Sequence, residues 1–236
     1  MTALHLADEG EAADLAAFLA RLIHYDRAAA VRLQASGTTL AVFGRPPSFE
    51  VLAIRTARLA KPYEDGLDLT LDVTVSAGEL LESLDEAAAT ATVPAAVTGP
   101  PWAGVLPPRG GWRPEPGLPA LDAVRTAVAA VVAEFRSRID ALAPEGRTRA
   151  ALDGIGREIW SRPVGDTELP VRAAHAAQSL GFLRPARTAS ATSATSPDEA
   201  TALRLLSSGA WLRLRTPYGT IAVRKAGLGA LDVSVR

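Results

Sequence analysis

"GAWLRLRTPYGTIAVRK", residues 209–225, predicts a β-hairpin in the second half of the chain. Apolar and polar residues alternate before a Pro-Tyr-Gly turn and a second short apolar run follows it, as expected for two paired strands. This alternation places Arg213, Arg215 and Arg224 on one face. Two interpretations stay open: the arginines bind a partner, or they form the solvated side of a sheet.

Three predicted helices precede the hairpin. Residues 119–142 repeat apolar side chains at the helical period, with Pro119 in the first turn, and two more helices are predicted over 147–161 and 170–181. Three helices followed by a hairpin is the order of a winged-helix domain. We also expect a mobile Ala/Ser/Thr loop over 186–198, a short helix over 197–207 and a last strand over 231–236.

In a winged-helix domain the third helix enters the major groove and the hairpin contacts phosphates. Arginine and glutamine suit both tasks, because they read base edges and neutralise the backbone. The alternative is that the third helix is buried and that the arginines only keep an exposed sheet soluble. The candidate nucleic-acid-binding residues are Arg172, His175, Gln178, Arg213, Arg215 and Arg224, and the residues that would bury the helix are Val171, Ala174, Ala177 and Leu180.

The first half of the chain predicts an α+β domain. An amphipathic helix over 8–23 is followed by strands over 29–35, 39–43 and 49–58, which we interpret as a meander. A fourth strand, over 67–75, leads into a helix over 77–89 that opens with Ser76 and Glu79 in a capping box. The fold class is therefore α+β: an N-terminal antiparallel sheet with flanking helices, then a C-terminal helical, winged-helix-like domain with a β-hairpin.

The two predicted domains, 1–92 and 119–236, are joined by a segment rich in proline and glycine. This segment, 93–118, also carries Trp102 and Trp112, which are costly to leave in water. We expect it to pack across a domain face. A proline-rich segment with aromatic anchors can also dock a partner, so the two tryptophans are candidate protein-interaction residues.

Composition limits the class of protein. The chain has 236 residues and no cysteine, which excludes disulfides, thiolate nucleophiles and thiolate zinc sites. We expect a cytoplasmic protein, because the acidic start has no secretory pattern and no run of about 18 apolar residues could span a membrane. Residues 1–100 carry a net charge of −7 and residues 101–236 one of +6, so the halves either serve different partners or attract each other.

No catalytic constellation stands out. The three histidines are far apart in sequence, and His24 at a helix end does not form a triad with its neighbours. Asp68 and Asp72 share a strand face at a separation of about 13 Å, which is too wide for a glycosidase pair. No phosphate-binding loop is recognisable. We therefore expect no catalytic residues, no metal site and no cofactor.

Three stretches carry a resemblance to a known family: "PPWAGVLPPRGGW" at 100–112, "AAHAAQSLGFL" at 173–183 and "WLRLRTPYGTIAVR" at 211–224. Together they resemble a family of uncharacterised two-domain actinobacterial proteins. The resemblance covers most of the chain and implies a division into two domains near residue 115. It implies no activity.

The sequence favours a non-enzymatic cytoplasmic binding or regulatory protein whose partner is a protein or DNA. One alternative is a DNA-binding winged-helix-like regulator. The other is an enzyme with a site of aspartate and arginine between the domains. A homodimer is also considered, because a terminal strand over 231–235 could pair across a two-fold axis.

Overall fold

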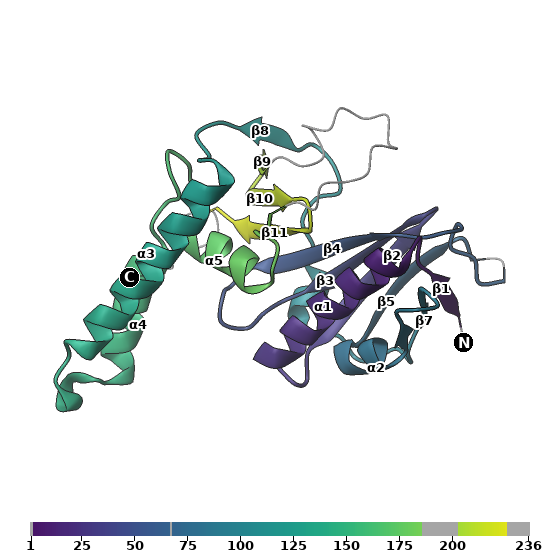
Figure 1. The fold of residues 1–236 in the computed structure, drawn as a ribbon, viewed down its shortest axis with the longest axis horizontal. Helices are drawn as coiled ribbons and strands as arrows, with labels where there is room; N and C mark the ends of the chain where they lie inside the picture. Colours follow the sequence, from purple (N-terminus) through teal and green to yellow (C-terminus); the bar gives the residue numbers. More distant parts are fainter. Residues whose placement is uncertain (1, 67, 186–202, 226–236) are drawn as a thin grey trace, which may run out of the picture.

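The computed structural model describes residues 2–66, 68–185 and 203–225. Within these residues the chain forms helices and strands in an α+β arrangement (Figure 1). The helical elements are α1 (Glu9–Tyr25), α2 (Ala77–Glu82), η1 (Pro101–Gly104), α3 (Leu121–Asp140), η2 (Pro144–Gly146), α4 (Arg149–Trp160) and α5 (Val171–Ser179). The strands are β1 (Ala3–His5), β2 (Ala30–Ser36), β3 (Thr39–Gly44), β4 (Leu52–Arg58), β5 (Thr70–Ser76), β6 (Leu84–Asp85), β7 (Thr90–Thr92), β8 (Arg113–Glu115), β9 (Arg204–Ser208), β10 (Trp211–Thr216) and β11 (Gly219–Arg224).

The meander of the first half is confirmed. Strand β2 pairs antiparallel with β3, and β3 pairs antiparallel with β4, while β5 adds to the other side of β2. Gly37 takes a φ of 56° in the tight turn between β2 and β3, a conformation that favours glycine. Asp8 caps α1 by accepting a hydrogen bond from the Glu11 amide, and the apolar side of α1 is buried.

The predicted hairpin is also confirmed. Strands β10 and β11 pair from Trp211 opposite Arg224 to Thr216 opposite Gly219. Thr216 closes the turn, because its hydroxyl accepts hydrogen bonds from the amides of Tyr218 and Gly219.

The hairpin does not stand apart from the first half. Strand β11 pairs with β4, with Ile221 opposite Ala53, and this contact joins both halves into one eight-stranded sheet. The strand order is β5-β2-β3-β4-β11-β10-β9-β8. The coarse α+β class is thus observed, whereas the winged-helix-like arrangement is not confirmed, because strands flank the hairpin on both sides.

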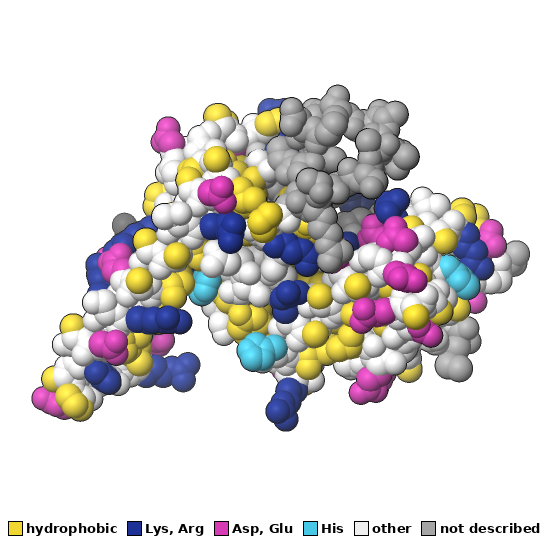
Figure 2. Space-filling view, in the orientation of Figure 1, with side chains coloured by type: hydrophobic (Ala, Val, Ile, Leu, Met, Phe, Trp, Pro, Cys, Tyr) yellow, Lys and Arg dark blue, Asp and Glu magenta, His cyan; other side chains and the backbone are white. Residues whose placement is uncertain are grey.

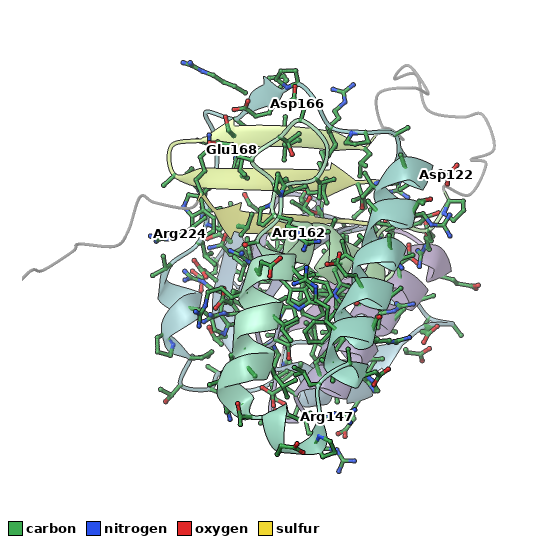
Figure 3. The ribbon with its side chains drawn as sticks, turned by 90° about the vertical axis from the view of Figure 1, so that its left-hand side faces the viewer. Asp122, Arg147, Arg162, Asp166, Glu168 and Arg224 are labelled. Carbon is green, nitrogen blue, oxygen red and sulfur yellow. The ribbon has the colours of Figure 1, made fainter. Side chains whose placement is uncertain are left out.

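Helices cover one face of this sheet, here called the inner face. Helices α1 and α5 pack on it, and their apolar side chains join the inward side chains of the strands in one core. Helices α3 and α4 form a pair that projects from the body, with only the first part of α3 buried (Figure 1). Arg162 binds Glu134 of α3 and Glu158 of α4, and Figure 3 shows it between the two helices.

The segment between the halves packs across the opposite, outer face. Trp102 and Leu106 lie against a small cluster of four outer-face residues. Trp112 is half-buried, and its indole nitrogen donates a hydrogen bond to the Pro108 carbonyl at 2.9 Å. The segment also contributes β8, which pairs with β9 at the sheet edge and was not predicted. The outer-face cluster consists of Phe43, Leu52, Ile54 and Ala222.

Two predicted helices need correction. The helix over 77–89 ends at Glu82, because the chain then turns into the short hairpin β6–β7. The helix over 197–207 is wrong where the structure describes it: residues 204–208 are strand β9, held between β10 and β8. A short apolar run such as "LRLL" does not distinguish helix from strand by periodicity.

The loop over 186–198 and the strand over 231–236 lie outside the described residues. The proposed dimer strand lies there too. Among the described helices, none is both long and apolar enough to cross a membrane.

Candidate functional site

A groove runs along the outer face where the ends of β3, β4, β10 and β11 meet. It consists of two adjoining cavities of about 350 and 680 Å³, which share Arg45 and Trp102. We call it the arginine–tryptophan groove. The residues that give it its chemistry are Arg45, Arg172, Arg224, Trp102, Trp211 and Glu50.

Three arginines from distant parts of the chain meet in this groove. Arg45 follows β3, Arg172 lies in the first turn of α5, and Arg224 ends β11 at one edge of the molecule (Figure 3). Glu50 is the one acidic residue of the smaller cavity, so its lining has an excess of positive charge. The Glu50 carboxylate lies 3.8 Å from Arg172, and neither Arg45 nor Arg224 forms an ion pair with a residue that the structure describes.

Apolar surface lies beside these charges. The Arg224 guanidinium stacks over the Trp211 ring, 5.1 Å from its centroid, and Trp102 lines both cavities. Val97 and Val105, two of the four large apolar side chains that are exposed in the described part, line the groove at 39% and 49% exposure. A ligand here would therefore contact both cations and apolar side chains.

Two local features distinguish the groove. Glu50 has a φ of 52°, in the left-handed region that non-glycine residues rarely adopt. The Nε of Arg172 is buried and makes no hydrogen bond within the described part. The atom that faces the Arg172 Nε is a Glu50 carboxylate oxygen at 3.8 Å, which is too far for a hydrogen bond. Backbone strain clusters at ligand sites.

The structure brings together only some of the predicted site residues. Arg172 and Arg224 meet in the groove with Trp102, while Gln178 is exposed elsewhere on α5. His175 is partly buried, stacked on Trp160 with ring centroids 4.8 Å apart.

Arg213 and Trp112 form a separate stacked pair, in which the Arg213 guanidinium lies 5.2 Å from the centroid of the Trp112 ring. Arg215 is exposed on the outer face, and the helix positions expected to be buried are buried: Val171, Ala174, Ala177 and Leu180.

Acidic and arginine side chains also meet between the two halves, over α1. Arg55 of β4 binds Glu11 at 2.9 Å, and Arg184 binds Asp14. Figure 2 shows acidic side chains gathered over α1. The cavity at this cluster measures only about 10 Å³, so the ion pairs fill the space themselves. Within the described part, no group of histidine and carboxylate side chains could hold a metal ion.

Sequence reasoning missed Arg45, Glu50 and Trp211 as members of the groove. Trp211 had a usable signal, because period two places it on the face of Arg213. Arg45 and Glu50 lie in loops, where no periodicity indicates direction.

Comparison with protein-family models gives a match for each half of the chain. Residues 107–228 match the model described as Domain of unknown function (DUF8185). The chain belongs to the DUF8185 family. Residues 1–104 match the model described as Domain of unknown function (DUF8010), so the DUF8185 part follows a second family domain, as the resemblance to a two-domain family implied. No curated protein and no solved structure matches the chain.

Proposed function

We propose that this protein is a non-enzymatic binding protein that takes an acidic, partly apolar peptide segment of a partner protein in the arginine–tryptophan groove. One observation carries the proposal: Arg45, Arg172 and Arg224 line one cavity together with Trp102 and Trp211, and the one carboxylate of that cavity, Glu50, lies 3.8 Å from the Arg172 Nε. Carboxylates of a partner would complete these charges, and Val97 and Val105 would take its apolar side chains.

The shape of the groove favours a peptide over a compact ligand. Its two cavities adjoin at Arg45 and Trp102, and their linings together reach from Arg224 to Ala30 at the start of β2. An extended segment can follow such a path, with one end among the arginines. Tryptophan and arginine are also the residues that most often dominate the energy of protein interfaces.

Duplex DNA binding through a wing is the alternative. It is supported by the order of helices and hairpin and by Arg213, Arg215 and Arg224 on one face. It is less well supported than peptide binding, because β4 and β9 flank the hairpin and α5 buries most of its side chains. An enzyme between the halves has weaker support still, because the aspartate and arginine cluster there leaves no room for a substrate.

The test is a titration with two fluorescein-labelled peptides, Glu-Glu-Leu-Glu-Glu-Phe and the same peptide with glutamine for each glutamate, followed by anisotropy. We expect the acidic peptide to bind and the neutral one to bind much more weakly. The double variant Arg172→Gln/Arg224→Gln should lose at least about tenfold in affinity, since hydrogen bonds between charged groups are the strong ones.

The matched control is Arg136→Gln, which removes an exposed arginine of α3 away from the groove. Equal binding of the acidic peptide by the double variant and the wild type would refute the proposal. A labelled 20-base-pair duplex, titrated at low and high salt, runs alongside. Salt-sensitive duplex binding without peptide binding would favour the DNA alternative.

A further inference from the structure

Another cavity, of about 420 Å³, lies on the outer face beside the segment that joins the two halves of the chain. Arg32 and Gln34 of β2, Thr56 of β4 and Arg213 of β10 contribute to its walls, and Gly104 and residues 106–109 form its rim. None of these residues lines the arginine–tryptophan groove. We call it the Arg213 cavity.

One pair of charges in the Arg213 cavity is already neutralised. Asp72 accepts hydrogen bonds from Arg32 at 2.7 Å and from Gln34 at 2.9 Å, and the Arg32 guanidinium holds the pKa of this carboxyl below its usual range. Arg32 also donates to the Ala103 carbonyl and so fixes the start of the rim. Asp72 is therefore engaged by Arg32 and is also attracted to Arg109, whereas no carboxylate acts on Arg213 in this way.

Arg213 has no carboxylate partner within the described part of the chain. Its guanidinium is half-buried, its Nε makes no hydrogen bond, and its neighbour is the Trp112 ring. Burial lowers the pKa of Arg213, and repulsion from Arg215 lowers it further. A cation that has lost water without gaining a counter-charge is costly, and an anion in the cavity would offset this cost.

We propose that the Arg213 cavity is a second binding site, for the phosphate or carboxylate group of a small polar molecule. Arg213 and Arg109 bind the oxyanion, Arg213 being able to present two parallel N–H donors. Thr56 and Gln34 lie on the same walls and supply hydrogen bonds to hydroxyl groups of the ligand. This site does not rest on the peptide proposal, because it uses other residues.

The experiment uses the full chain labelled with 5-fluorotryptophan and follows ¹⁹F resonances during titration with inorganic phosphate. Acetate is titrated separately, and chloride keeps the ionic strength constant. Trp112 reports on the site because Arg213 stacks on its ring, whereas Trp160, packed between α3 and α5, is an internal reference. We expect a saturable shift of the Trp112 resonance. Saturation by acetate as well as by phosphate would indicate a carboxylate site, and saturation by phosphate alone a phosphate site.

Three variants decide the assignment. Arg213→Gln should lower the affinity for the anion at least about tenfold, as expected for loss of a charged hydrogen-bond partner. Arg215→Gln is the matched control, because Arg215 lies two residues along the same strand face but is exposed and outside the cavity. Arg172→Gln, a groove variant, should titrate like the wild type. The proposal fails if neither anion shifts Trp112 saturably or if Arg213→Gln binds as the wild type does.

Discussion

Arg55 of β4 donates a hydrogen bond to the backbone carbonyl of Tyr218 at 2.8 Å, across 163 residues of sequence. The same guanidinium binds Glu11 of α1, and its side chain is only 7% exposed. Arg55 thus ties the first half of the chain to the hairpin turn at the place where β4 and β11 pair.

Replacing Arg55 with alanine should lower the free energy of unfolding by about 3–5 kcal/mol, because it leaves buried acceptors without their donor. Arg58→Ala provides the comparison. Arg58 binds the same Glu11, but it is 69% exposed, so its loss should cost less than about 1 kcal/mol. Urea denaturation followed by circular dichroism measures both. Equal losses in the two variants would contradict the distinction drawn from burial.

Separating the halves should disrupt the first of them. A fragment of residues 1–104 exposes the β4 edge that β11 covers, and Phe18 of α1 loses its stacking with Phe182 at 5.7 Å. We expect this fragment to aggregate or to lack fixed tertiary structure, and co-expression with residues 105–236 to restore a soluble complex. Gel filtration and an amide NMR spectrum test this, and a monomeric fragment with a dispersed spectrum would show that the first half folds alone.

Gly219 at the start of β11 should not tolerate a side chain. A Cβ there would lie 2.5 Å from the Phe182 ring, which is buried against Phe18, so we expect Gly219→Ala to cost about 1–3 kcal/mol. Gly154→Ala in α4 is the opposite case, because nothing lies within 4 Å of its added Cβ. It should raise stability by about 0.5–1 kcal/mol through better helix propensity. In thermal unfolding, the midpoint temperature should therefore fall for Gly219→Ala and rise for Gly154→Ala.

His175 should make the fold less stable in mild acid. Burial between Trp160 and Phe49 lowers its pKa below the ordinary value of 6.5. The unfolded chain then binds more protons than the folded chain between the two pKa values, so stability falls as pH drops below about 6.5. His175→Gln removes this contribution. Urea denaturation at pH 8 and pH 5 should show a larger loss in the wild type than in the variant, and parallel losses would contradict the assignment.

Local patterns predicted much of the fold. Local patterns indicated strands over 29–35, 39–43 and 67–75, where the structure has β2, β3 and β5, and helical periodicity indicated α1 and α3. The same alternation correctly placed Arg213, Arg215 and Arg224 on one sheet face. Strand β9 and the edge strand β8 were missed, because segments of three to five residues are too short for periodicity to identify.

The candidate site was predicted only in pieces. Arg172, Arg224 and Trp102 were singled out for separate reasons, and nothing in the sequence showed that they would meet. Their meeting depends on α5 packing against β11 and on the segment after Pro100 crossing the outer face.

The sequence by itself determined which residues form strands and helices and which side chains share a face, because side-chain polarity repeats with the period of the local backbone. Only the tertiary structure decided that β11 pairs with β4, and hence that one sheet spans both family domains. Strand pairing is made by backbone N–H and C=O groups that all residues other than proline share, so periodicity carries no information about the partner. The groove and the Arg213 cavity follow from that pairing, because strands from both halves build them.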